Sequence, residues 1–221
     1  MNSGPKGRTQ DIAQLPIRER ILSAAFEAFT EHGYAQASTL QIASRARVSK
    51  RELYALVGNK QEMLVACIGD RVKRMQMPSD LPALRDREGL GAVLTDFGSL
   101  LLRELTDPDV IAMHRLAIAE AERSPEVARA LETFGRQPIR ALLKNLFAQA
   151  QSAGLLDDTD PALMAAQFMA LLWKDLTIGL LLRVTDRPAP TEARRRAREA
   201  ASALLRLHPT PSFPLPPARE D

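Results

Sequence analysis

Side chains able to bind nucleic acid lie close together near residue 50 of this 221-residue chain. Lys50 and Arg51 carry charged N–H groups, which can donate to phosphate oxygens or to the O6 and N7 atoms of guanine. The hydroxyl group of Tyr54 suits a phosphate oxygen. These groups recognise a ligand by hydrogen bonds and charge, and they form no catalytic set.

The spacing of these residues places them together if residues 50–57 form a helix. At about 100° per residue, the polar side chains and a small residue share one arc, and three apolar residues share the opposite arc. The outward arc holds Lys50, Arg51, Tyr54 and Ala55. The arc expected to face the core holds Leu53, Leu56 and Val57. An ordinary amphipathic helix with a solvated charged face is the alternative interpretation of the same pattern.

Three capping signals define the helices around this segment. In each, a Ser or Asn can accept first-turn N–H groups, and a Gln or Glu three residues later can reach back. The three signals are Ser38 with Gln41, Ser49 with Glu52, and Asn59 with Glu62. They predict short helices over 39–46 and 50–57 and a longer helix from Lys60. Two short helices joined by a tight turn form a helix-turn-helix, whose second helix enters the major groove of DNA.

The remaining pattern predicts an all-α fold. Apolar residues recur at helical spacing, proline and glycine separate the segments, and no long alternating run argues for a sheet. Pro138 predicts a break or kink near Gln137 within its helix. The other expected helices are 16–32, 88–105, segments starting at Pro108 and Pro125, 161–183 and 191–207.

Charge is distributed unevenly along the chain. The first 77 residues hold 12 Lys and Arg against 7 Asp and Glu, a net of +5, whereas the rest hold 18 against 20, a net of −2. A positive segment suits a phosphate backbone. With 45% hydrophobic residues, the chain can bury a real core.

The segment from Arg18 to Leu64 resembles the DNA-binding domain of the TetR family of transcriptional regulators. The resemblance rests on Ile21-Leu22, Ala24-Ala25, Phe29, Gly33-Tyr34, Ile42-Ala43, Val48-Ser49-Lys50, Leu53-Tyr54, Lys60 and Glu62. The chain departs from the family pattern where Arg47 replaces the usual glycine of the turn, where Val57 replaces a frequent phenylalanine, and at Arg51-Glu52.

The resemblance implies a role for each matched residue. Thr39, Tyr54 and Lys60 are expected to hold phosphates, and Lys50 and Arg51 to reach base edges. Ser49 is expected to contribute at the helix start, with Arg47 close by. Lys6 and Arg8 are candidates for an arm towards the minor groove, or for an ordinary disordered tail.

The resemblance also predicts the organisation of the whole chain. The expected parts are a flexible arm over 1–15, the helix-turn-helix domain over 16–62, a helical effector-binding and dimerisation domain over 63–207, and a proline-rich disordered tail over 208–221. The expected partners are a palindromic double-stranded DNA operator, a small-molecule effector, and a second copy bound through helices near 161–183 and 191–207.

The effector is expected to be small and mostly apolar. The large apolar residues available are Phe97, Met113, Phe134, Phe147, Phe168, Met169 and Trp173, and all of them except Phe147 are candidates to line its pocket. Trp173 is the leading candidate because an indole N–H can orient a ligand in an apolar cavity. An ordinary core position is the alternative for each of the six.

The sequence thus predicts a ligand-responsive transcriptional regulator that acts as a repressor. A helical protein-interaction module without sequence-specific DNA binding is the alternative. No catalytic set, metal cluster or phosphate loop stands out, so neither an enzyme nor a cofactor is expected. The apolar segment 161–182 is long enough to span a bilayer, but Gln167, Lys174 and Asp175 interrupt it and favour a helix buried in protein. One cysteine and the absence of an apolar leader predict a cytoplasmic protein.

Overall fold

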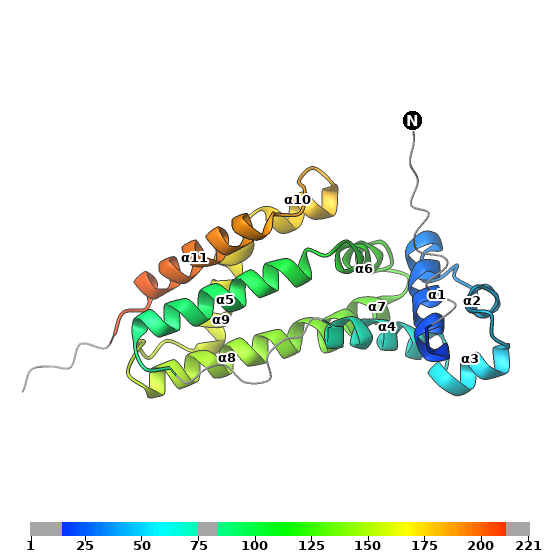
Figure 1. The fold of residues 1–221 in the computed structure, drawn as a ribbon, viewed down its shortest axis with the longest axis horizontal. Coiled ribbons are helices and arrows are strands. Elements are labelled where there is room, and N and C mark those ends of the chain that lie inside the picture. Colours follow the sequence, from blue (N-terminus) through cyan, green and yellow to red (C-terminus); the bar gives the residue numbers. More distant parts are fainter. Residues whose placement is uncertain (1–14, 75–83, 211–221) are drawn as a thin grey trace, which may run out of the picture. The chain divides into compact units, whose positions relative to one another are not determined.

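The computed structural model describes residues 15–74 and 84–210, and every regular element in these ranges is helical (Figure 1). The predicted all-α fold is therefore confirmed. The helices are α1 (Ile17–His32), α2 (Thr39–Ala46), α3 (Lys50–Val57), α4 (Lys60–Arg74), α5 (Arg87–Leu105), α6 (Pro108–Ala119), α7 (Pro125–Ala130), the π-helical η2 (Leu131–Arg136), α8 (Gln137–Ser152), α9 (Pro161–Trp173), α10 (Leu176–Leu182) and α11 (Pro190–Leu207).

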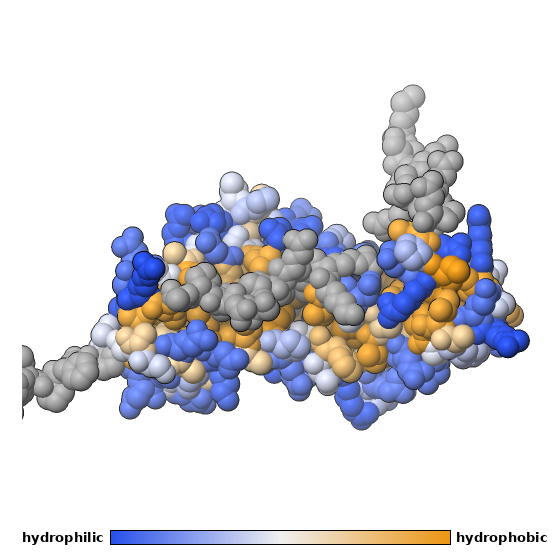
Figure 2. Space-filling view, turned by 60° about the horizontal axis from the view of Figure 1, so that its bottom comes forward, coloured by the Kyte–Doolittle hydropathy of each residue, from blue (hydrophilic) through white to orange (hydrophobic). Residues whose placement is uncertain are grey.

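Contacts between residues divide the chain into two compact units, which are described separately. The first unit joins residues 1–77 to 108–137, and the second joins 78–107 to 138–221. The first unit thus contains α6, α7 and η2 beside the helix-turn-helix segment. On the face drawn in Figure 2, hydrophobic residues come to the surface between hydrophilic ones.

The first unit is built around α1, which contacts α2, α3, α4 and α6. One face of α1 buries Ile21, Leu22, Ala25 and Phe29 completely or nearly so. Helices as short as α2 and α3 are marginal alone, so they depend on this apolar face for their stability.

The capping boxes form as the sequence predicts. The Ser38 hydroxyl accepts from the N–H groups of Leu40 and Gln41, and the Gln41 side chain accepts from the Ser38 N–H. Ser49 and Glu52 form the same reciprocal pair at the start of α3. Asn59 and Glu62 do so at the start of α4. These local hydrogen bonds explain why α2 and α3 span the residues that the sequence predicted.

In the second unit, α5 packs along α11, and α9 packs against both. Gly98 of α5 permits this close approach, because a Cβ atom there would lie 3.1 Å from Ala197 Cβ and 3.2 Å from Phe168 Cζ. The Phe147 ring contacts the Phe168 ring, with 6.4 Å between their centroids. This part of the unit is therefore filled by side chains.

Hydrogen bonds from Arg87 and His208 fix the C-terminal end of α11. The Arg87 guanidinium donates to the carbonyl oxygens of Leu155, Leu205 and His208. His208 is 4% exposed, and its ring hydrogen-bonds Asp157 and the Gln167 side chain. The prediction assigned His208 to the start of a disordered tail, but the structure includes its side chain in the core. These partners were not predictable from local sequence, because they lie 41 or more residues away.

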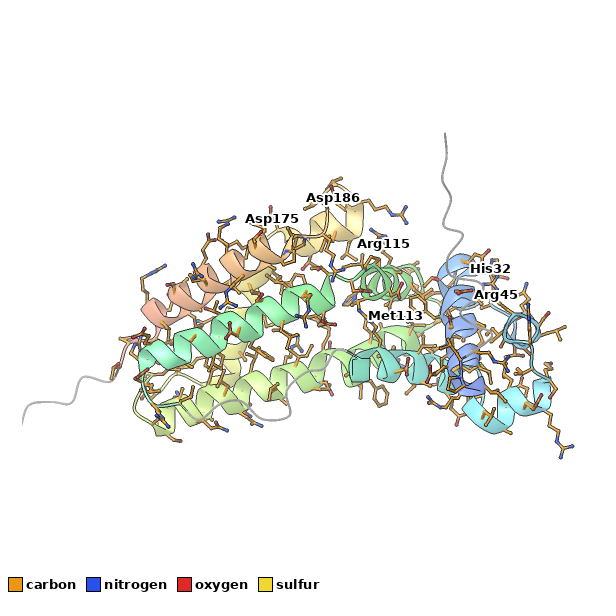
Figure 3. The ribbon with its side chains drawn as sticks, in the orientation of Figure 1. His32, Arg45, Met113, Arg115, Asp175 and Asp186 are labelled. Atoms are coloured by element: carbon orange, nitrogen blue, oxygen red, sulfur yellow. The ribbon has the colours of Figure 1, made fainter. Side chains whose placement is uncertain are left out.

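The predicted continuous helix over 161–183 is wrong, because the chain leaves the helix at Lys174. This residue has φ 45° and ψ −125°, and α9 and α10 meet at an angle of 55°. The break leaves Lys174 and Asp175 exposed, as Figure 3 shows for Asp175, while Leu176 and Leu180 of α10 are buried. The turn therefore keeps two charges in solvent between two apolar segments.

The irregularity predicted from Pro138 is present as η2, which ends at Arg136. Proline has no N–H to donate to the carbonyl four residues earlier. A π turn pairs residues five apart instead, as the bond from the Gln137 N–H to the Glu132 carbonyl shows. The helix thus accommodates the proline by a change of register.

Among the described residues, no single helix has both the length and the apolar character to cross a bilayer. Helices α9 and α10 reach the required length and apolar character only when they are counted together, and they are bent by 55° at their junction. The predicted arm with Lys6 and Arg8, and the part of the predicted tail over 211–221, lie outside the described residues.

Candidate nucleic-acid interface

Three residues separate α2 from α3, and backbone hydrogen bonds fix their path. The Val48 N–H donates to the Ala43 carbonyl at 3.0 Å, and the Arg47 N–H donates to the Ser44 carbonyl at 3.1 Å. Val48 packs against the core of the first unit. The Ser49 hydroxyl both accepts from the Glu52 N–H and donates to the Glu52 carboxylate. The structure therefore uses Ser49 to fix the start of α3.

The four residues predicted for the outward arc of α3 are all exposed, while Leu53 is fully buried. Leu56 was predicted to face the core, and this is wrong, because it is 45% exposed. Leu53 and Val57 lie one turn apart and already occupy the contact that this short helix makes with the core. Leu56 consequently lies at the edge of the exposed arc.

Two of the predicted phosphate-binding residues meet across the helix-turn-helix. The Thr39 hydroxyl, at the first residue of α2, lies 3.2 Å from the hydroxyl of Tyr54 on α3. Each hydroxyl can donate one proton and accept others, so the pair can hydrogen-bond internally and still contact an external oxygen. This bond joins the start of α2 to the exposed arc of α3.

Arg47 occupies the left-handed region, with φ 55° and ψ 50°, at the C-terminal end of α2. A residue with a Cβ atom is strained there, whereas glycine is not. Its side chain is exposed. The chain therefore keeps a cation beside the candidate interface at a backbone position that glycine would occupy more easily.

We expect Arg47→Gly to raise stability and to weaken DNA binding. Relief of backbone strain should raise the free energy of unfolding by about 1 kcal/mol. Loss of one cation per chain should lower the steepness with which affinity falls as salt increases. Urea unfolding and DNA titrations at several salt concentrations measure the two effects. Lower stability of the glycine variant would contradict the strain at residue 47.

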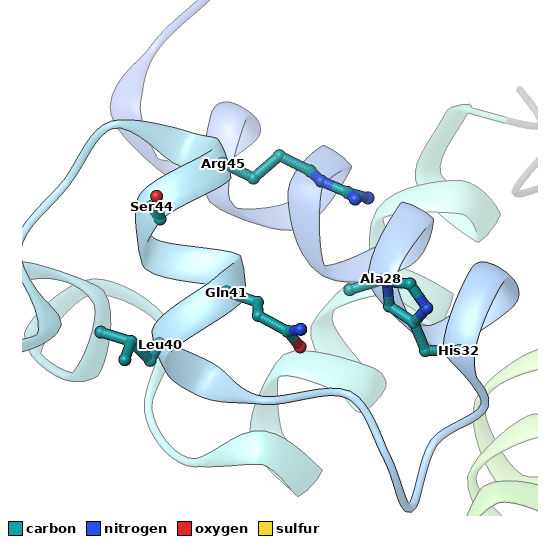
Figure 4. A pocket seen from close by; sticks show the side chains of 6 residues that line it. All are labelled: Ala28, His32, Leu40, Gln41, Ser44 and Arg45. Carbon is teal, nitrogen blue, oxygen red and sulfur yellow. The ribbon is translucent and has the colours of Figure 1, made fainter.

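The charge of Arg45 is already compensated. Its guanidinium lies 2.9 Å from the Glu31 carboxylate and 3.6 Å from that of Glu27. The hydrogen bond from Arg45, helped by the charge of His32, lowers the pKa of Glu31. Arg45 borders an open hollow between α1 and α2 (Figure 4). These carboxylates assign Arg45 to joining α2 to α1.

The Lys60 ammonium lies at the start of α4 and faces the segment between α1 and α2. Its Nζ atom donates to the Ala35 carbonyl at 2.9 Å and lies 4.7 Å from the centre of the Tyr34 ring. Burial lowers the pKa of Lys60, and the charges of Glu120 and Glu126 oppose that shift. Burial raises the pKa of Tyr34, as do Glu126 and Glu120. An ammonium group has three donors, so Lys60 can hold Ala35 and still donate elsewhere.

The six candidate effector-binding residues do not fall in one unit. Met113, labelled on α6 in Figure 3, is buried in the first unit, where Phe134 of η2 is 43% exposed. Phe97 and Phe168 are buried in the second unit, where Met169 and Trp173 are half-buried on α9. Phe168 is packed against Phe147, so an ordinary core role already accounts for its position.

Sequence reasoning missed Glu120. Its Oε1 atom accepts from the Ala35 N–H at 3.2 Å although 85 residues separate the two along the chain. No local pattern signals such a contact, because the helix-turn-helix prediction used only neighbouring residues.

Comparison with known families covers both halves of the chain. Residues 21–67 match a family described as bacterial regulatory proteins, tetR family. Residues 92–208 match the C-terminal domain of AefR-like transcriptional repressors.

Individual relatives agree with these matches. The HTH-type transcriptional repressor KstR of Mycolicibacterium smegmatis is 25% identical over 201 residues, which cover 91% of this chain and 93% of KstR. The structure of the flavonoid-responsive regulator FrrA matches with a TM-score of 0.74 and 25% identity over 89% of this chain and 98% of FrrA. A TetR regulator from Agrobacterium tumefaciens matches with a TM-score of 0.72 and 26% identity over 89% of this chain and 96% of that structure.

Proposed function

The chain belongs to the TetR family of bacterial transcriptional regulators, and from this premise we propose that it is a ligand-responsive repressor. It binds a palindromic operator as a homodimer, and a small, mostly apolar effector releases it. The repressor KstR, and the match to the C-terminal domain of AefR-like repressors, support repression over activation.

The exposed arc of α3 carries this proposal. Lys50, Arg51 and Tyr54 point away from the core on a helix whose start is fixed by a capping box. In our proposal, Lys50 and Arg51 donate to base edges, while Thr39, Tyr54 and Lys60 hold phosphates. Arg47 adds charge near the backbone, and Ser49 sets the position at which α3 begins.

Dimerisation is supported by an apolar stripe on α9. Ala162, Ala166 and Ala170 are exposed at intervals of one turn, and Leu163 beside them is 49% exposed. The opposite side of α9 buries Met164, Phe168 and Leu172, so the stripe is additional to the core of the unit.

Helices α10 and α11 also expose side chains, which are apolar on α10 and charged on α11. On α10, Ile178 is 61% exposed and Leu182 is 66% exposed. Exposed apolar surface of this kind is typical of a protein interface. Helix α11 exposes charged side chains, including Arg195 paired with Glu192 and Glu199. In our proposal, α11 lies at the charged border of the interface.

Selection from a random pool of DNA duplexes tests the proposed DNA binding. The full chain should enrich a palindrome whose half-sites lie about 34 Å apart, one turn of the DNA helix. This enriched sequence is called the selected duplex below. Enrichment of no sequence, or of one without two-fold symmetry, would contradict the proposal.

We expect a flavonoid or another lipophilic aromatic compound to release the selected duplex. FrrA, with its TM-score of 0.74, is named as responsive to flavonoids. A compound at 100 times its Kd stabilises the folded state by about 2.7 kcal/mol, which raises Tm by several degrees. A thermal-shift screen finds such compounds, and DNA titration tests release. Compounds that bind this chain and leave its DNA affinity unchanged would contradict control by an effector.

The fluorescence of Trp173 provides an independent measurement of effector binding. It is the single tryptophan of the chain, so a change in tryptophan fluorescence reports its surroundings alone. We expect a compound that raises Tm to quench this fluorescence. Trp173→Phe should weaken binding of that compound, whereas Phe26→Leu, on α1 of the first unit, should leave its binding unchanged.

A further inference from the structure

The segment Gly33–Ala35, between α1 and α2, is held from two directions. On one side, the Ala35 N–H donates to Oε1 of Glu120, which directly follows α6. On the other side, the Ala35 carbonyl accepts from Lys60 Nζ at the start of α4. The same Nζ atom lies over the ring of Tyr34. One short segment thus connects the end of α6 to the first residue of α4.

Glycine at position 33 makes the approach of Glu120 possible. Gly33 has φ +82°, and a Cβ atom there would lie 2.8 Å from Glu120 Oε1. The backbone conformation therefore favours glycine at this position, and the missing Cβ atom leaves room for the carboxylate. Gly33 also ends α1, where its N–H donates to the Phe29 carbonyl.

Glu120 is a buried acid at the edge of the helix-turn-helix. It is 7% exposed, and its Oε2 atom is buried without a hydrogen-bond partner in the described part of the chain. A buried carboxylate is costly unless a positive group lies near it. Lys60 supplies that charge, since Glu120 acts on the Lys60 ammonium electrostatically.

We propose that Glu120 is a positioning residue that holds Lys60, through Ala35, where its ammonium group can reach a DNA phosphate. The inference rests on the proposed function, because it assigns a control point to the same DNA-binding surface. Glu120 fixes the Ala35 peptide by its N–H, and the carbonyl of that residue fixes Lys60. A shift of the end of α6 therefore moves the Lys60 ammonium without any change in α3.

The proposal predicts that Glu120 and Lys60 act on DNA as one unit. Glu120→Ala should weaken binding of the selected duplex by about tenfold. It should also make the fall of log K with log salt less steep, by about 0.9 per chain, which is the change expected when one phosphate contact is lost. Lys60→Ala should cause the same two changes. Adding Glu120→Ala to Lys60→Ala should change affinity by less than about twofold, since coupled residues are not additive.

Two further variants separate positioning from a general loss of structure. Glu120→Gln keeps an oxygen that can accept from Ala35, and it should recover most of the affinity. Glu120→Asp keeps the charge but is one methylene shorter, so it should behave like the alanine variant, and it replaces that variant if Glu120→Ala does not fold. Glu122→Ala removes an exposed acid two residues away and is the matched control.

The outcomes distinguish this inference from the proposed function. If the unmodified chain enriches no duplex, DNA binding itself fails. If it does bind, but the losses from Glu120→Ala and Lys60→Ala add, or the salt slope of Glu120→Ala equals that of the unmodified chain, then positioning by Glu120 is wrong and the DNA-binding proposal stands.

Discussion

Replacing Lys50, Arg51 and Tyr54 together by alanine should lower affinity for the selected duplex by about 1000-fold. Each well-placed contact to a base edge contributes about 1–3 kcal/mol of discrimination, and a dimer loses every contact twice. All three side chains are exposed, and Leu53, which anchors α3, is unchanged. Fluorescence anisotropy with a labelled selected duplex measures the loss.

A charge-matched variant identifies which cations matter. Lys144→Ala with Arg129→Ala removes two exposed positive charges, from α8 and α7, and should change the affinity by less than about threefold. The triple variant should keep its dimer mass and its circular dichroism spectrum. Equal losses in the two variants would mean that DNA responds to net charge, and the recognition role of α3 would be wrong.

A negative charge on the apolar stripe of α9 should separate the dimer. Ala166→Glu with Ala170→Glu places four carboxylates in a two-fold interface. There the carboxylates repel one another, and each loses its hydrating water. Both alanines are exposed in the single chain, so its own core is not disturbed. Light scattering should show a mass near 24.4 kDa in place of twice that value.

The separated chains should also bind DNA weakly. Linking two DNA-binding heads makes the second contact intramolecular, which increases affinity by 100-fold or more. We therefore expect a loss of about 100-fold for the selected duplex. Ala141→Glu, an exposed alanine on α8, is the control and should remain dimeric. A dimer that persists in the double variant would place the interface elsewhere.

Features that depend on residues close together in the sequence were predictable. The bounds of α2 and α3 were predictable because Ser38 and Ser49 cap them through partners three residues away. The exposed arc of α3 was also predictable, since it depends only on the helical repeat. Leu56 was misplaced because the repeat does not say how much of a short helix the core covers.

Features set by distant partners were not predictable. The break at Lys174 has no proline or glycine beside it, and it depends on how the chain buries Leu176 and Leu180. The compensation of Arg45 by Glu27 and Glu31 requires α2 to lie against α1. The contact between Glu120 and Ala35 spans 85 residues. Each needs the tertiary fold before it can be recognised.

If α3 reads base sequence, a substitution on its exposed arc should change the DNA sequence that the protein prefers. The selection from a random pool should be repeated with the Arg51→Ala variant of the full chain. We expect a palindrome in which one base position of each half-site, related by the two-fold axis, becomes less specific, while the other positions stay the same. The same consensus, with equal preference at every position, would contradict base recognition by Arg51 on α3.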